Sequence, residues 1–204
     1  PAFDLRELRQ DRGKGYWKMK VKQLAFTALM AALCCILGPL SVPLGSVPVS
    51  LGVLAVYLAA YVLGGKWGSL SVLIYLLLGL AGLPVFSGFA GGPGKMLGPT
   101  GGFLIGFLFL AAICGGFVTL SDHRKGLARY GLQITGMILG LAACYALGTM
   151  YFMFVMKTGL TAALAACVLP FLIFDALKMI MALILGNALR RALTFANLLE
   201  TSRV

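Results

Sequence analysis

Six apolar segments follow one another along the chain, and they constrain its fold more than any other feature of the sequence. A transmembrane helix needs about 20 predominantly apolar residues, and shorter segments can span when their flanking side chains reach the interface. Gly64-Gly65-Lys66 is typical of a turn, so we treat the segments on either side of it as two helices. We therefore predict an all-α integral membrane protein, a compact bundle of six transmembrane helices. The segments cover residues 23–40, 49–63, 67–83, 98–120, 128–156 and 170–189.

The composition places the chain outside the soluble globular class. Of its 204 residues, 60% are hydrophobic and 11% are charged, whereas a soluble domain averages about 45–50% and about 25%. The net charge of +11 is also a feature of nucleic-acid-binding proteins, but in a hydrophobic membrane protein the basic residues mark the cytoplasmic loops. We therefore predict the lipid bilayer as the environment of the chain and exclude nucleic acid as a partner.

The cysteines and the single histidine do not indicate a metal centre or a cofactor. The five cysteines lie inside apolar stretches, none forms a Cys-x-x-Cys pair, and His123 is the only histidine. A buried free cysteine behaves as a small hydrophobic residue. We predict that the cysteines are structural, and we expect neither a metal nor a cofactor. They are Cys34, Cys35, Cys114, Cys144 and Cys167.

The first 22 residues differ from the rest of the chain. They carry seven of the 17 basic residues and three of the six acidic residues, and they contain no apolar run. They also lack the order of charged, apolar and small residues that defines a cleaved signal peptide. We predict an amino-terminal extension at residues 1–18, with a juxtamembrane amphipathic arm as the alternative. Residues 19–204 form a single six-helix membrane domain in this interpretation.

The placement of lysine and arginine predicts the orientation in the membrane. With six spans both termini lie on one side, and cytoplasmic loops carry an excess of basic residues. A cytoplasmic amino-terminus leaves only Lys95 and Lys157 on the opposite face, within outward loops at residues 41–48, 84–97 and 157–169. We therefore predict that both termini are cytoplasmic. The basic residues then on the cytoplasmic side are Lys18, Lys20, Lys22, Lys66, Arg124, Lys125, Arg129, Arg190, Arg191 and Arg203.

Two ionisable residues in the sixth apolar segment are the candidates for a binding site. Asp175 is the only acid between Asp122 and Glu200, and Lys178 follows it by three residues, on the same helical face. Pro170 favours the first helical turn, which puts the pair about 8 and about 12 Å below the outer start of the helix. Charges at this depth face the protein interior and are paired. Either the pair only neutralises itself within the packing, or it lines a pocket for a polar ligand.

Two stretches carry small residues at helical spacing. Gly102-x3-Gly106 and Ala28-x3-Ala32 both allow close helix contact. For the second pair the sequence leaves two interpretations, packing within the chain or docking to another membrane protein. Lys95 follows a glycine, but the stretch lacks the first glycine and the serine or threonine of a Walker A motif, so we predict no nucleotide site.

The sequence resembles the BioY family, the biotin-binding S components of energy-coupling factor (ECF) vitamin transporters. Three stretches carry the resemblance: GLAGLPVF at residues 79–86, GPTGGFLIGF at residues 98–107 and DALK at residues 175–178. Their order and spacing match from Met19 to about Leu193. The resemblance implies a six-helix S-component fold, with biotin held near the outer surface.

The resemblance also implies which residues recognise the ligand. Asp175 and Lys178 correspond to the aspartate and lysine that contribute in the family, and the loop after the third helix and the start of the fourth also contribute. Aromatic neighbours would cover the apolar ring of biotin. Two positions depart from the family: Phe103 replaces a frequent tyrosine, and Gly88 stands where some relatives have an amide side chain. The remaining candidate residues are Phe86, Ser87, Thr100, Tyr151, Phe171 and Phe174.

As an S component, the chain would need partners for active uptake. The family implies a transmembrane coupling subunit and two cytoplasmic ABC ATPases, with Ala28 and Ala32 facing the coupling subunit, in a prokaryotic cytoplasmic membrane. The chain itself is then a transport subunit and no enzyme. The alternatives are an S component for thiamin or riboflavin, an intramembrane enzyme, and an ion channel using Asp175 as a relay. The enzyme lacks paired acids or an activated nucleophile, and the relay lacks a second group.

Overall fold

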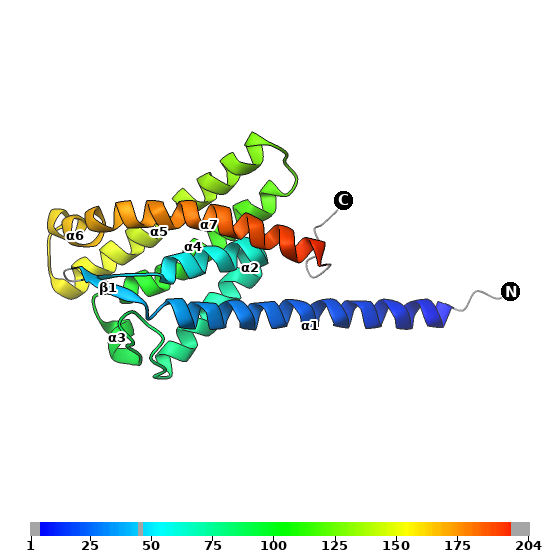
Figure 1. Ribbon diagram of the computed structural model, residues 1–204. Helices are drawn as coiled ribbons and strands as arrows, with labels where there is room; N and C mark the ends of the chain where they lie inside the picture. The colour runs from blue at the N-terminus through cyan, green and yellow to red at the C-terminus, as the bar shows by residue number, and fades with distance from the viewer. Residues whose placement is uncertain (1–4, 45–46, 197–204) are drawn as a thin grey trace.

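The fold is a helical bundle with one short hairpin (Figure 1). The structure is a computed structural model that describes residues 5–44 and 47–196, and the side chains of residues 21–42 and 48–196. In chain order the elements are α1 (Leu5–Leu37), β1 (Ser41–Leu44), β2 (Val47–Ser50), α2 (Gly52–Leu80), α3 (Pro93–Leu97), α4 (Gly101–Ser121), α5 (Leu127–Met156), α6 (Leu160–Cys167) and α7 (Leu169–Phe195).

The short elements gather at one end of the bundle. The hairpin of β1 and β2, α3 and α6 lie at the left in Figure 1, and we call this the hairpin end. The start of α1 and the end of α7 lie at the opposite end, which we call the terminal end (Figure 1). The three segments that the sequence predicts as outward loops therefore lie together, and each contains a short regular element.

Helix α2 is broken in its middle, where the sequence predicts a turn. Gly64 has φ 73° and ψ −174°, which is outside the helical region. The two halves then fold back on each other, because a Cβ atom added to Gly68 would lie 3.1 Å from the Cα of Ala60. Counting α2 once, four helices in the described part of the chain are long and apolar enough to cross a membrane, namely α2, α4, α5 and α7. Residues Val21–Leu37 of α1 form a shorter apolar helix.

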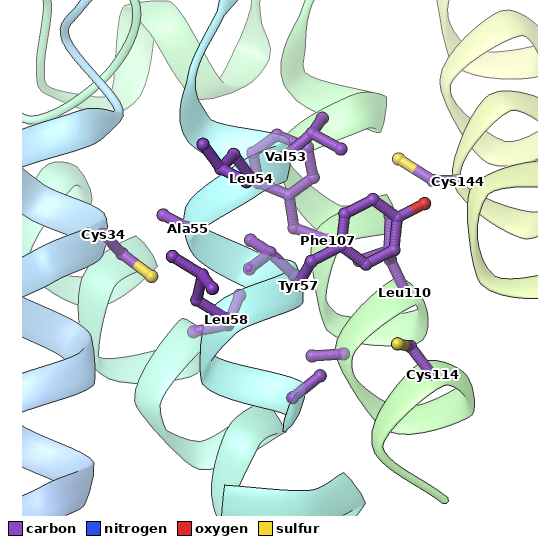
Figure 2. Close-up of a cluster of buried hydrophobic side chains, with 14 of the residues drawn as sticks. Cys34, Val53, Leu54, Ala55, Tyr57, Leu58, Phe107, Leu110, Cys114 and Cys144 are labelled. Carbon is purple, nitrogen blue, oxygen red and sulfur yellow. The ribbon is translucent and has the colours of Figure 1, made fainter. Parts of the chain in front are cut away.

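The first half of α2 is the centre of the core. Residues 52–62 are buried on every side of the helix, and α2 packs against α1, α4 and α7. Figure 2 shows Tyr57 of α2 between α4 and α5, beside Phe107 and Leu110. The Tyr57 hydroxyl donates a hydrogen bond to the Met137 carbonyl at 3.1 Å. A helix that is apolar all round requires such a surrounding shell, so the other helices are arranged about it.

The Gly102-x3-Gly106 pair is a helix contact within the chain. A Cβ atom on Gly102 would lie 2.3 Å from the Cβ of Tyr151, and one on Gly106 would lie 2.8 Å from Cys144 Sγ. Both partners belong to α5, so the two glycines set the close approach of α4 to α5.

The segment after α1 differs from the predicted loop and from a purely α-helical fold. It is an antiparallel hairpin in which Pro43 faces Pro48. The Leu51 amide donates to the Leu40 carbonyl, which makes the 40–51 pair hydrogen-bonded and places the 43–48 pair at a non-hydrogen-bonded position. Proline is tolerated there because its missing N–H would point away from the partner strand. The sequence interpretation overlooked this because two prolines in ten residues favour a loop.

Helix α1 begins well before the first predicted span. It is continuous from Leu5 to Leu37, so residues 5–18 of the predicted extension are helical and run directly into the apolar part. The backbone alone is described for these residues.

Candidate functional site

The two ionisable residues of α7 form an ion pair inside the bundle. Lys178 Nζ lies 2.7 Å from Asp175 Oδ1, and the Tyr145 hydroxyl of α5 donates to Asp175 Oδ2 at 2.5 Å. Asp175 is 2% exposed and Lys178 is 6% exposed. We call these three residues the ionic cluster. Asp175 and Lys178 lie on the inward face of α7, where the buried residues 171, 175, 178 and 182 repeat at helical spacing, and Tyr145 reaches them from α5.

The ionic cluster has hydrogen-bonding capacity that the described residues leave unused. An ammonium group carries three N–H donors, and Lys178 spends one of them on Asp175. A carboxylate offers about four lone-pair sites, and Asp175 accepts from two donors. A buried charged group is stabilised when its remaining donors and acceptors are also paired. The cluster can therefore take both an N–H donor and an anionic or carbonyl acceptor from a ligand.

Aromatic residues border the ionic cluster on the side of the hairpin end. Phe171 of α7, 6% exposed, packs in one apolar cluster with Phe152 of α5 and Val49 of β2, and Tyr145 and Phe103 lie against it. Phe103 also packs on the face of Gly148, where a Cβ atom would lie 2.3 Å from its ring. The predicted site residue Phe171 thus lies one turn from Asp175, beneath the hairpin.

Thr100 lies at the start of α4, and Tyr151 of α5 packs against the same segment. Thr100 is half-buried and occupies the position before the first residue of the helix. The Tyr151 hydroxyl donates to the Leu97 carbonyl at 3.2 Å, and its ring packs on Gly101. Tyr151 therefore joins α5 to the segment at the start of α4. The Phe103 amide donates to the Thr100 carbonyl, and the Phe103 side chain packs against the apolar cluster.

Phe86 and Ser87 lie beside the second half of α2. Phe86 is fully buried, with its ring in an edge-to-face contact with Tyr75 at 5.6 Å, and it covers Gly79 so closely that a Cβ there would clash. Ser87 is half-buried. Phe86 thus packs on α2 and belongs to the main apolar core.

Phe174 is the predicted site residue with the most exposed side chain. It precedes Asp175 in the chain but is 43% exposed, so it lies off the inward face of α7. The structure brings Asp175, Lys178 and Phe171 together and leaves Phe174 on the outer surface of the bundle.

The two alanines of α1 lie on an uncovered face. Ala28 and Ala32 are exposed, whereas Thr27, Met30 and Ala31 on the other side of the helix are buried. Within the described residues, packing inside the chain therefore does not account for this small-residue pair.

A second buried polar cluster lies at the terminal end. Gln133 Nε2 donates to Ser121 Oγ at 3.1 Å, and Asn187 Nδ2 donates to Gln133 Oε1 at 3.0 Å. We call Ser121, Gln133 and Asn187 the amide cluster. Beside it, the Arg190 guanidinium donates to both oxygens of Asp122 at 2.8 and 2.7 Å.

The described residues hold no group of three histidine, cysteine or acidic side chains that fits a metal ion. Four of the five cysteines are buried and Cys35 is partly buried, and all are free. Cys167 lies in α6, outside the four candidate spans, and burial raises the pKa of its thiol to about 11. This thiol therefore stays protonated at neutral pH.

Comparison with known proteins assigns the chain to a family. The model of the BioY family matches residues 10–195. The chain belongs to the BioY family. Its BioY relatives include the Thermotoga maritima protein named biotin transporter BioY, 37% identical over 84% of this chain and 97% of the relative. The probable biotin transporter BioY of Pyrococcus horikoshii is 38% identical over 84% of this chain and 98% of its own.

A solved structure shares the fold of this BioY chain. It is a crystal structure described as the S-component for biotin from an ECF-type ABC transporter, with a TM-score of 0.78 and 32% sequence identity. The match covers 85% of this chain and 93% of the other. The BioY match begins at residue 10, inside the segment that the sequence interpretation treats as an extension.

Tyr145 is the member of the ionic cluster that the sequence did not indicate, even with the BioY resemblance. It lies 30 residues before Asp175 on another helix, and its aromatic side chain does not stand out in an apolar segment. Of the two departures from the BioY pattern, Phe103 packs into the apolar cluster, and exposed Gly88, at φ 74°, has open space where a side chain would begin.

Proposed function

We propose that the chain binds biotin at the ionic cluster and takes it up as the substrate-specific S component of an ECF-type ABC transporter. The observation that carries the proposal is the buried Tyr145–Asp175–Lys178 arrangement with unused donors and acceptors. Biotin offers two urea N–H groups, a urea carbonyl and a carboxylate, which match those free positions. Its apolar ring matches the aromatic border formed by Phe171 and Phe152. The printed names of the relatives and of the solved structure support the same ligand.

The remaining site residues belong to the proposal with different roles. We assign Thr100 and Tyr151 to the rim of the site at the start of α4, and Ser87 to the neighbouring loop. Phe86 holds that loop against α2 through its contacts with Tyr75 and Gly79. Phe174, which is exposed, adds no contact to the ligand. Thiamin and riboflavin are the competing ligands within the same class of transporter.

The test is radiolabelled biotin binding to the purified chain in detergent, with unlabelled thiamin and riboflavin as competitors. We expect saturable binding that neither competitor displaces. Asp175→Asn and Lys178→Met should each weaken it about 100-fold or more, because truncating one partner of a buried charge pair is that costly. Asp122→Asn and the exposed Lys66→Met are the matched controls at the terminal end and should bind like the parent chain.

A well-folded sample that binds no biotin would refute the ligand assignment. Binding that survives both substitutions on α7 would move the site away from the ionic cluster.

We further propose a cytoplasmic-membrane location in a prokaryote, with six spans and the terminal end in the cytoplasm. One observation supports the number of spans and another supports the orientation. The halves of α2 fold back at Gly64, so each can count as a span. The basic residues between α4 and α5 and at the end of α7 lie together at the terminal end, where Arg190 and Arg129 approach Asp122. In this proposal residues 19–204 are the membrane domain and residues 1–18 extend from it.

The proposed partners are a transmembrane coupling subunit, which docks on Ala28 and Ala32, and two ABC ATPases that supply the energy. The exposed position of both alanines supports this docking face. Ala28→Leu with Ala32→Leu should abolish co-purification with the coupling subunit and leave the affinity of the isolated chain for biotin unchanged within about twofold, because the bulk is added on an outer surface. Retained co-purification would remove these residues from the interface.

A further inference from the structure

Thr149 of α5 carries a buried hydroxyl without a partner. The residue is 4% exposed, and within the described part of the chain its Oγ1 atom has no hydrogen-bond partner. Buried hydroxyl groups are normally paired, and an unpaired one destabilises the fold. An unpaired buried hydroxyl therefore points to a partner outside the chain.

Other threonines of this chain make a hydrogen bond within their own helix that Thr149 does not make. A helical threonine can donate to the carbonyl four residues earlier in its own helix. Four threonines do so at 2.8 to 2.9 Å, and one of them, Thr135, lies on the same helix as Thr149. The hydroxyl of Thr149 does not use the carbonyl that its own helix offers. The four are Thr27, Thr119, Thr135 and Thr194.

The position of Thr149 is between two contacts that join α5 to α7. Tyr145, four residues earlier, bonds to Asp175, and Phe152, three residues later, packs in one cluster with Phe171. Residues at this spacing share one face of a helix, about 5–6 Å apart. Thr149 therefore lies on the face of α5 that borders the ionic cluster, in the stretch between the charges and the aromatic residues.

We propose that the Thr149 hydroxyl is a specificity-determining group that hydrogen-bonds the cyclic urea of the ligand. The inference rests on the proposed function and adds a residue to that site. A hydroxyl both donates and accepts, which suits a urea that presents a carbonyl beside its N–H groups. The carboxylate of the ligand instead pairs with a cation, which is the Lys178 ammonium group.

The test compares Thr149→Val, which replaces the hydroxyl by a methyl group of similar size, with Thr149→Ser, which keeps a hydroxyl. Dissociation constants are measured for the purified chain with biotin, with desthiobiotin, which lacks the ring sulfur, and with biotin amide, which lacks the charged carboxylate. We expect Thr149→Val to weaken all three about tenfold and Thr149→Ser to stay within about threefold, because one neutral hydrogen bond is lost only in the first. Thr135→Val, an exposed position with a paired hydroxyl, is the control and should not change binding.

A second readout separates a binding role from a structural one. Because Thr149→Val removes an unpaired buried hydroxyl, the unfolding temperature of the ligand-free variant should equal or exceed that of the parent chain. Binding that falls while stability holds supports the inference, and a lower unfolding temperature with unchanged affinity would overturn it in favour of a structural water or an internal bond.

The analogues locate the contact. A tenfold loss that disappears with desthiobiotin would place the hydroxyl at the ring sulfur, and one that disappears with biotin amide would place it at the carboxylate. Either result would overturn the assignment to the urea. A parent chain that binds no biotin would refute the proposed function itself, whereas a parent chain that binds and a valine variant that equals it would refute only the role of Thr149.

Discussion

The ionic cluster and the amide cluster are two buried polar groups that connect the same helices, α5 and α7, and they differ in how completely they are paired. In the amide cluster both side-chain nitrogens donate two hydrogen bonds each, to side chains and to the Leu183 carbonyl. In the ionic cluster Lys178 donates one bond of three, and the neighbouring Thr149 donates none. Complete pairing suits a permanent joint between helices, and incomplete pairing suits a site that a ligand completes.

The largest effect is expected when the ionic cluster is broken. The variants separate its role in ligand binding from its role in packing. Lys178→Met leaves the Asp175 carboxylate buried without its counter-ion, so it should destabilise the chain by about 3–5 kcal/mol. The double variant Asp175→Leu with Lys178→Met removes both charges and should recover most of this stability, while biotin binding stays at least 100-fold weakened. Thermal unfolding and equilibrium binding in the same detergent measure both. A double variant that binds biotin like the parent chain would show that the ion pair serves packing alone.

The next largest effect, on stability, is expected when the amide cluster is broken. Asn187→Leu leaves Gln133 Oε1 buried without its donor and should lower the free energy of unfolding by about 2 kcal/mol, and the double variant with Gln133→Leu should recover part of it. Biotin affinity should stay within about twofold in both, because the cluster lies at the opposite end of the bundle from the hairpin. A tenfold change in affinity would mean that the two clusters are coupled, and the amide cluster could not be a purely structural joint.

A smaller effect sharpens the role of Tyr145. Tyr145→Phe removes the hydroxyl that holds Asp175 Oδ2 and should weaken biotin binding about tenfold, since one hydrogen bond to a charged group is lost. Tyr130→Phe on the same helix, an exposed tyrosine beside Arg191, is the matched control and should bind normally. Equal affinity in the two variants would remove Tyr145 from the site.

The smallest effect is expected at Phe174. This side chain is next to Asp175 in the chain but faces outward. Phe174→Ala should change biotin affinity by less than about twofold, as exposed substitutions away from a site usually do. A titration that shows a larger loss would mean that the ligand reaches around α7, and it would restore the residue to the site.

The sequence predicts the ionic pair well because charge in an apolar helix has few interpretations. Asp175 and Lys178 interrupt a long apolar segment at a spacing that places them on one face, and the structure has them paired. Tyr145 and Thr149 cannot be found in this way, because tyrosine and threonine occur in many helices of membrane proteins without function. Their role depends on which helix faces which, and α5 meets α7 across a sequence separation of 30 residues.

The helices were likewise easier to predict than what joins them. The break at Gly64 follows from two adjacent glycines and a lysine inside an apolar run. The hairpin could not be read from residues 41–50, since prolines usually argue against a strand and only the register shows that these two occupy tolerated positions. The outward orientation of Phe174 could not be predicted from the sequence either, because the neighbouring helices decide how wide the buried face of α7 is.

The proline pair of the hairpin bears on how the protein avoids aggregating. A two-stranded sheet has two free edges, and the backbone groups at its non-hydrogen-bonded positions point outward along them. Pro43 and Pro48 occupy such positions, one on each strand, so each edge lacks a donor near its middle. An added strand from another molecule would find an interrupted ladder on either side. The hairpin is therefore a poor template for the strands of neighbouring chains.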